Sequence, residues 1–332
     1  MKNLLKYILS IVLVLLVIFF GCKEDKKGVS NTTQTEKKQY KIPAFNGDSA
    51  YVFVKNQVDF GPRVPGTEAH KKAIEYFVKK FEGYGAKVEK QNFKAKFVLG
   101  FEADATNIIA HMNPGKSKKI IIAAHFDSRK IAEKDPDESM RDKPIDGADD
   151  GASGVGIILE LARLMKENQL DLSVDFILFD AEDNGDDSGS EDTWCLGSQY
   201  WSKEAKKVNY KADFGFLFDL VGAKGAVYPK EGYSIYYAGD IQNKLWNLAA
   251  GMGYGDLFAN VERGYITDDH VYVNRDAGIR MVDIINIPND NGSFGFYHHT
   301  HSDNMDIIDI NTLRRTGQVL LAFMFKYANG DL

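Results

Sequence analysis

The order of apolar and polar segments along the chain predicts helices that alternate with strands. Helical stretches, marked by apolar stripes or by flanking glycines, are expected at 69–84, 151–167, near 242–251 and from Asn311 onward. Short continuous apolar runs, typical of strands buried on both faces, occupy 120–124, 174–179, 214–220 and 280–285. This alternation favours an α/β fold in which a mostly parallel sheet is covered on both sides.

Acidic residues and histidines stand at the C-terminal ends of these strands or in the loops that follow them. They are His125, Asp127, Glu182, Asp183, Asp219 and His299. Open α/β sheets bind ligands along the carboxyl edge of their strands, so one crevice can collect all of these side chains. This convergence is the main argument from the sequence for an active site.

The adjacent acids Glu182 and Asp183 predict a bound cation, because two carboxylates at the mouth of a buried strand repel one another. Together with Asp150 and His299, Asp183 would form a three-ligand zinc site with one open position, which is typical of catalytic zinc. Consecutive residues that leave a strand face opposite ways, so Glu182 would stay free as general base and acid. Asp303 is expected to orient the imidazole of His299.

Each of these segments also has a more ordinary interpretation when it is taken alone. The acidic pair after 174–179 could cap a helix or lie in a solvated loop, and Asp149 and Asp150 could cap the helix that follows them. The histidines of 297–301 could be surface residues. However, four of the chain's seven histidines fall within 270–301. The presence of all three segments together favours a metal site.

Composition narrows the class of protein further. The chain has 332 residues, of which 44% are hydrophobic, and this is enough for one large core or two modest ones. The formal net charge of −6, without a basic cluster interleaved with aromatics, gives no reason to expect nucleic acid as a partner. The two cysteines, Cys22 and Cys195, exclude a disulfide framework. We expect Cys195 to have a buried apolar role beside Trp194.

The first 22 residues are predicted to be a targeting segment rather than part of the fold. Two lysines precede an apolar run at 7–20, and a Gly-Cys junction follows at Cys22. This junction resembles a bacterial lipoprotein signal, which implies a lipid anchor on Cys22 and an exported protein on the periplasmic or cell-surface side of the envelope. The alternative is an uncleaved membrane anchor. The polar segment 23–39 is expected to be a flexible tether to a single catalytic domain at 40–332.

Taken together, several motifs resemble the zinc-dependent exopeptidase superfamily, which includes metal aminopeptidases and animal-type glutaminyl cyclases. The matching segments are His125-Phe126-Asp127-Ser128, Gly147-Ala148-Asp149-Asp150, Phe179-Asp180-Ala181-Glu182-Asp183, Phe218-Asp219-Leu220-Val221-Gly222-Ala223, Asp268-Asp269-His270 and His299-Thr300. They cover the chain from about Phe60 to its end. The resemblance implies a three-layer α/β/α sandwich around a mixed, mostly parallel sheet.

Two kinds of enzyme within this superfamily fit the motifs. For a two-zinc aminopeptidase, the resemblance implies metal ligands at His125, Asp150, Asp183, Asp219 and His299. Glutaminyl cyclases use one zinc, which would be held by Asp150, Asp183 and His299, with Asp183 standing where animal cyclases have Glu. Three features favour the cyclase: Asp268 before Asp269-His270, the segment 219–223, and the Trp194-Cys195-Leu196-Gly197-Ser198 and Tyr200-Trp201 segments.

The resemblance thus implies a glutaminyl-peptide cyclotransferase, which converts the N-terminal glutamine of peptides or proteins to pyroglutamate and releases ammonia. One zinc ion per chain would polarise the γ-amide carbonyl while Glu182 carries the proton. Asp219 and Asp268, sharing a proton, would anchor the leaving amide, and Trp194 and His298 would contact the substrate. The alternatives are the two-zinc aminopeptidase and a non-catalytic peptide-binding lipoprotein, and the intact Glu182 argues against the latter.

Overall fold

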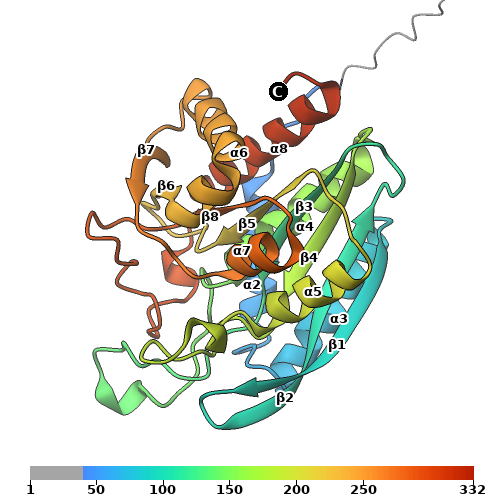
Figure 1. The fold of residues 1–332 in the computed structure, drawn as a ribbon. Helices are drawn as coiled ribbons and strands as arrows, with labels where there is room; N and C mark the ends of the chain where they lie inside the picture. The colour runs from blue at the N-terminus through green and yellow to red at the C-terminus, as the bar shows by residue number, and fades with distance from the viewer. Residues whose placement is uncertain (1–39) are drawn as a thin grey trace, which may run out of the picture. The chain divides into compact units, whose positions relative to one another are not determined.

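A six-stranded mixed sheet forms the centre of the structure, a computed structural model that describes residues 40–332 (Figure 1). The strands lie in the order β1-β2-β4-β3-β5-β8. Their bounds are β1 Lys87–Phe97, β2 Phe101–Met112, β3 Lys119–His125, β4 Ser173–Phe179, β5 Phe214–Asp219 and β8 Met281–Ile285. The four strands β4, β3, β5 and β8 are parallel, whereas β1 and β2 add an antiparallel hairpin at one edge.

Helices cover both faces of this sheet. One face is covered by α2 Gly47–Val58, α3 Glu68–Gly83, α4 Ala152–Glu167 and α8 Ile310–Asn329. The other face is covered by α5 Leu196–Lys207 and the short α7 Asp269–Tyr272. At the β8 edge, α6 Gly232–Gly251 packs with the small parallel pair of β6 Tyr228–Glu231 and β7 Phe258–Arg263. The predicted α/β class and the three-layer sandwich are therefore confirmed (Figure 1).

The period-two alternation of strand side chains divides the apolar core into two layers. In β3, Ile120 and Ile122 pack into the large core under α2, α3, α4 and α8. Their neighbours Ile121 and Ala123 point to the opposite core, where they meet Trp201 of α5. Both faces of the central strands are buried, which is why these strands are continuous apolar runs in the sequence.

Local capping explains where the predicted helices begin and end. Thr67 caps α3 by accepting a hydrogen bond from His70 N, and Asp309 caps α8 by accepting one from Thr312 N. The C-cap of α8 is Gly330, whose φ of 76° suits a glycine. The predicted helices and strands are all present, with bounds that shift by a few residues. The exception is α6, which begins ten residues before the predicted stretch, at Gly232.

The β1–β2 hairpin has no clear signal in the sequence, because most side chains of β1 are exposed and many are charged. Pairing with β2 keeps these residues extended, and the antiparallel register runs from Lys87 opposite His111 to Phe97 opposite Phe101. Within residues 40–332, no helix is both long and apolar enough to cross a membrane. The predicted signal segment, tether and lipidated Cys22 lie outside the described residues.

Candidate active site

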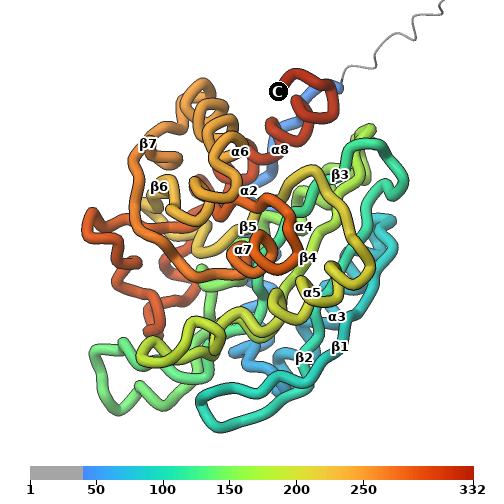
Figure 2. The backbone as a smooth tube through the Cα atoms, in the orientation of Figure 1, coloured from blue at the N-terminus to red at the C-terminus, as the bar shows by residue number. Residues whose placement is uncertain are grey.

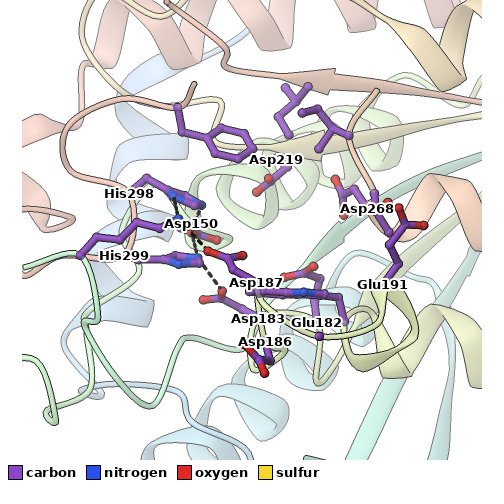
Figure 3. Close-up of a pocket in the computed structure, with 17 residues that line it drawn as sticks. Asp150, Glu182, Asp183, Asp186, Asp187, Glu191, Asp219, Asp268, His298 and His299 are labelled. Carbon is purple, nitrogen blue, oxygen red and sulfur yellow. Dashed lines mark hydrogen bonds and ion pairs between the residues drawn. The ribbon is translucent and has the colours of Figure 1, made fainter. Parts of the chain in front are cut away.

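The loops that follow the parallel strands converge at one end of the sheet, as Figure 2 shows for the loops after β3, β4 and β8. They enclose a cavity of about 270 Å³. The residues predicted for the cyclase site line this cavity: Asp150, Glu182, Asp183, Trp194, Asp219, Asp268, His298 and His299 (Figure 3). The predicted His125, Asp127 and Asp303 are not part of its lining. The carboxyl edge of the sheet therefore brings together side chains that the sequence separates by more than a hundred residues.

The three predicted zinc ligands meet around His299. Its Nε2 atom lies 3.2 Å from Asp183 Oδ1 and 3.9 Å from Asp150 Oδ2. Among the described residues, the buried Asp183 Oδ2 has no hydrogen-bond partner. Burial raises the pKa of Asp183 to about 6, and the charge of Asp150 acts in the same direction. Two buried carboxylates that face one imidazole nitrogen form a donor set that fits a zinc ion.

The capping interpretation of the Asp149-Asp150 segment is wrong. The N-cap of α4 is Gly151, and the side chain of Asp149 accepts hydrogen bonds from Gly222 N at 2.6 Å and from Tyr297 OH at 2.6 Å. These hydrogen bonds hold Asp149, and with it the loop before α4, against the loops after β5 and β8. Asp150 is consequently left to face the cavity.

The prediction that Asp303 orients His299 is also wrong. Asp303 accepts hydrogen bonds from the backbone N–H groups of Asp149, at 2.7 Å, and Asp150, at 3.2 Å, so it positions the loop rather than the imidazole. The contact with the imidazole is made by Glu133, whose Oε1 lies 2.6 Å from His299 Nδ1. Burial raises the pKa of Glu133, but hydrogen bonds from His299 and Arg129 outweigh it and lower the pKa to about 2.

His125 lies at the centre of a second group of acids. Its Nε2 atom is 3.1 Å from Asp150 Oδ1 and 3.3 Å from Asp219 Oδ1, and its Nδ1 atom is 3.6 Å from Asp127 Oδ1. Burial lowers the pKa of His125, but the neighbouring carboxylates of Asp127, Asp150 and Asp219 raise it well above its ordinary value. The same atoms of His125, Asp150 and Asp219 are close enough to hold a metal ion. The negative charge of these carboxylates can thus be balanced by a protonated His125 or by a second metal ion.

Glu182 lies beside Asp183 with its carboxylate outside the Asp150–Asp183–His299 set. Its backbone N–H donates to Asp127 Oδ1 at 2.9 Å, which fixes the chain just after β4. Burial raises the pKa of Glu182 well above its ordinary value, and the charge of Asp268 adds to this effect. A carboxylate with a raised pKa at a cavity wall is suited to accept and return a proton.

Cys195 is buried, as expected, but its predicted apolar role is wrong. Its thiol donates a hydrogen bond to Glu182 Oε1 at 3.1 Å, and its backbone N–H donates to Glu182 O at 3.0 Å. Burial raises the pKa of the thiol well above its ordinary value, so the sulfur stays protonated and acts as a donor. Cys195 therefore contacts the candidate base directly.

Asp219 and Asp268 line the cavity on the side away from His299 in the view of Figure 3. Burial is the main cause that raises the pKa of Asp219 to about 8, and the charges of Asp150 and Asp268 contribute in the same direction. Asp268 Oδ1 accepts a hydrogen bond from Asp269 N at 2.5 Å. The close contact of Asp219 is with His125, and the predicted sharing of a proton between Asp219 and Asp268 remains a prediction.

The rings of Trp194 and His298 both stack on the imidazole of His299. The distance between ring centroids is 5.9 Å for Trp194 and 3.7 Å for His298. The Trp194 ring also lies against Gly185, where a Cβ atom would stand 2.3 Å from the ring. The Trp194 ring can thus occupy this position only because residue 185 is a glycine.

Gly151 permits a similarly close approach, and we expect Gly151→Ala to disrupt the site. A Cβ atom there would lie 2.4 Å from His125 O and 2.6 Å from the His125 ring. The backbone oxygen cannot move aside cheaply, so we expect a loss of about 1–3 kcal/mol in the free energy of unfolding, with a fall in activity. Thermal denaturation and turnover measure both.

Gly83→Ala is the matched control, because a Cβ atom at this last residue of α3 would meet nothing within 4 Å. It should leave activity unchanged and stabilise the helix by up to about 1 kcal/mol. Equal losses in the two variants would contradict the steric explanation.

The buried acids predict that the metal-free protein loses stability as pH rises from 5 to 8. Burial raises the pKa of Asp183 to about 6 and that of Asp219 to about 8. Their contribution is fully present below the unfolded pKa and is lost as pH rises through these values. The raised pKa values of His125 and His299 act with the same sign, whereas the lowered pKa of His298 opposes them.

Melting temperatures measured with a chelator at several pH values test this expectation. Asp183→Asn should flatten the profile of the metal-free protein. Zinc should stabilise the parent protein more at pH 8 than at pH 5, since zinc competes with protons for its ligands. A metal-free melting temperature that rises steadily across this range would contradict the assignment of buried, repelling acids.

The fold and this donor set define a class of protein. A sequence model of peptidase family M28 matches residues 107–324, which is more than half of the chain. The chain therefore belongs to peptidase family M28.

Similarity to particular proteins shows which members of this family the chain resembles. The glutaminyl cyclase of Bacteroides thetaiotaomicron, solved bound to N-acetylhistamine, is 45% identical, with 86% of this chain and 99% of that chain covered and a TM-score of 0.83. A leucine aminopeptidase precursor from the same organism is also 45% identical, with the same coverage and a TM-score of 0.82. The glutaminyl-peptide cyclotransferase of Gloydius blomhoffii is 25% identical over an alignment of 303 positions, which covers 81% of this chain and 77% of that protein. The predicted resemblance to glutaminyl cyclases of the zinc exopeptidase-like superfamily is confirmed.

Proposed function

We propose that this chain is a glutaminyl-peptide cyclotransferase that closes the N-terminal glutamine of peptides or proteins to pyroglutamate and releases ammonia. The observation that carries the proposal is one cavity that holds both a zinc-type donor set and an acid outside that set. The donor set is Asp150, Asp183 and His299, and the separate acid is Glu182. Similarity to glutaminyl cyclases along nearly their full length supports the same activity.

When bound, a zinc ion would act as Lewis acid on the γ-amide carbonyl of the substrate. Glu182 takes a proton from the α-amine, whose nitrogen attacks the γ-carbonyl carbon. The new C–N bond closes a five-membered lactam and the bond to the amide nitrogen breaks. Glu182 then returns the proton to that nitrogen, which leaves as ammonia. Nucleophile and electrophile belong to one molecule, so the reaction consumes no water.

The remaining cavity residues have positioning roles in this proposal. Asp219 and Asp268 accept hydrogen bonds from the departing amide nitrogen. Trp194 and His298 pack against the glutamine methylenes, because both rings border the cavity beside His299. Lys134 lies at the same wall, with its Nζ 3.2 Å from His298 Nδ1.

We propose one zinc per chain, with a protonated His125 in the place of a second metal. The position of His125 supports this: its Nε2 lies 3.1 Å from Asp150 Oδ1 and 3.3 Å from Asp219 Oδ1, where an imidazolium can balance both carboxylates without a further cation. The rival function is a two-zinc aminopeptidase. One observation favours it: ligand atoms of His125, Asp150 and Asp219 lie close enough together to hold a metal ion.

A product assay with metal counting separates the two functions. Purified protein is incubated with a peptide that begins with glutamine and with a matched peptide that begins with leucine. The cyclase should release ammonia and pyroglutamyl peptide from the first alone and contain one zinc by elemental analysis. Free amino acids and two zinc ions per chain would establish the aminopeptidase instead. Zinc binding without any product would leave the non-catalytic peptide-binding protein.

We further propose that residues 1–22 are a lipoprotein signal, that 23–39 are a tether, and that 40–332 act as one catalytic domain. Lipidation of Cys22 would place the enzyme on the periplasmic or cell-surface side of a bacterial membrane. Incorporation of labelled palmitate into the parent protein, and its loss in Cys22→Ser, tests the anchor. Labelling that persists in the variant would contradict it.

A further inference from the structure

Glu133 connects an insert in the chain to the candidate metal site. It lies in the loop after β3, between residues 126 and 151, and 166 positions before His299. Its Oε1 atom is 2.6 Å from His299 Nδ1, and its Oε2 atom accepts a hydrogen bond from Arg129 Nε at 2.7 Å. Both oxygens are thus occupied, and the carboxylate has a defined orientation.

Arg129 is itself fixed to the segment that carries the second candidate ligand. Its guanidinium donates to Asp183 O at 2.8 Å and to Gly185 O at 3.3 Å, and its side chain is 3% exposed. The ring of Trp194 lies 4.8 Å from the guanidinium carbon and also stacks on His299. Glu133 therefore contacts the loop after β8 directly and is linked to the loop after β4 through Arg129.

The contact with Glu133 determines which nitrogen of His299 can bind a metal. A carboxylate at 2.6 Å from Nδ1 requires a proton on Nδ1, which leaves the lone pair of the neutral imidazole on Nε2. Nε2 is the atom that faces Asp183 and Asp150. A separation of 2.6 Å is also too short for two ligands of one zinc ion, since bonds of about 2.0–2.1 Å at tetrahedral angles place donors about 3.3 Å apart. Glu133 is thus a partner of the imidazole and not a fourth ligand.

We propose that Glu133 is a positioning residue that holds His299 in the tautomer and orientation whose Nε2 binds zinc. The inference rests on the ligand set of the proposed function. Carboxylates behind a ligating histidine typically raise metal affinity by about 10–100-fold, because they fix the ring and increase its basicity. Glu133 would therefore act on zinc affinity first and on turnover only through the bound zinc.

Asp135 provides a matched control from the same insert. Its Oδ2 accepts hydrogen bonds from His301 N at 2.9 Å and forms a contact with His301 Nδ1 at 2.8 Å. It ties the insert to the same segment that carries His299, but it touches a histidine outside the proposed ligand set. A role in merely attaching the insert would make Asp135 and Glu133 equivalent.

The experiment measures the zinc dissociation constant of the full chain by competition with a chelator, for the parent, Glu133→Ala, Glu133→Gln and Asp135→Asn. We expect about 10–100-fold weaker binding in Glu133→Ala. Glu133→Gln should bind with intermediate strength, because its amide oxygen still accepts from Nδ1–H. Asp135→Asn should stay within about threefold of the parent. Excess zinc should restore most of the turnover of the Glu133 variants.

Two results would overturn the inference: a Glu133→Ala affinity within about threefold of the parent, or an equal loss in Asp135→Asn. Glu133→Gln keeps the size of the side chain and decides the question if Glu133→Ala does not fold. Failure of the proposed function would differ from both, because the parent itself would then bind no zinc, or would bind zinc without forming pyroglutamate.

Discussion

Glu182→Gln should reduce kcat for cyclisation by about 10²–10⁴-fold, the usual contribution of a general acid–base residue, while zinc remains bound. The amide keeps the size and the hydrogen-bonding oxygen of the carboxylate but cannot accept the proton of the α-amine. Glu182 lines the cavity beside the proposed ligands without belonging to them. The measurement is ammonia release under saturating glutaminyl peptide, together with zinc content.

Asp183→Asn distinguishes the loss of a base from the loss of a ligand. Asp183 is the neighbouring residue, and its carboxylate faces His299 Nε2 at 3.2 Å. Its replacement should lower zinc content as well as activity. Substantial retained turnover in Glu182→Gln, or loss of its zinc, would refute the assignment of Glu182 as the proton carrier.

His299→Ala should abolish tight zinc binding and reduce kcat/KM by about 10³-fold or more. Lewis-acid stabilisation by a metal is worth several kcal/mol, and each 1.4 kcal/mol or so corresponds to a factor of ten. The side chain of His299 is buried and stacks on Trp194 and on His298, and its two nitrogens are directed to Glu133 and Asp183. Zinc analysis after dialysis and a peptide assay measure the two effects.

His298→Ala is the informative comparison, because its imidazole stacks on that of His299 and its Nε2 lies 3.9 Å from Asp150 Oδ2. It should retain zinc, since the proposed set uses His299 alone, and should weaken substrate binding. If His298→Ala loses zinc and His299→Ala retains it, then His298 is the ligand and the assignment of His299 is wrong.

The candidate site contains more acid than its histidines can neutralise. Burial raises the pKa values of Asp183, Asp219 and Glu182, which means that the charged forms are disfavoured in the metal-free fold. A cation relieves this cost. The same arrangement that destabilises the empty site therefore favours metal binding, and the predicted pH dependence of the metal-free protein reports on it directly.

Much of the fold could be predicted from the sequence because its signals are local. A strand that is buried on both faces needs a continuous apolar run, and 120–124 and 174–179 show it. The hairpin strand β1 escaped prediction because its residues are largely exposed and its pairing with β2 stabilises it. Edge strands of this kind carry little periodic signal of their own.

The members of the candidate site could also be predicted, although their contacts could not. Residue type and position after a strand led to Asp150, Glu182, Asp183 and His299, and all four line one cavity. From the sequence, Asp303 is expected to contact His299 because the two residues are close in the chain. The structure instead places Asp303 under the Asp149-Asp150 backbone.

The α/β class, the strands that carry the chemistry and the residue types at their ends can all be predicted from the chain, because periodicity and strand-end position are local properties. The contact of Glu133 with His299 across 166 positions, and the hydrogen bond from the Cys195 thiol to Glu182, become visible only in the folded protein. Such contacts depend on how separate loops pack over the sheet edge. No short-range pattern specifies them, because each partner is an ordinary polar residue until folding brings it within hydrogen-bonding distance of the other.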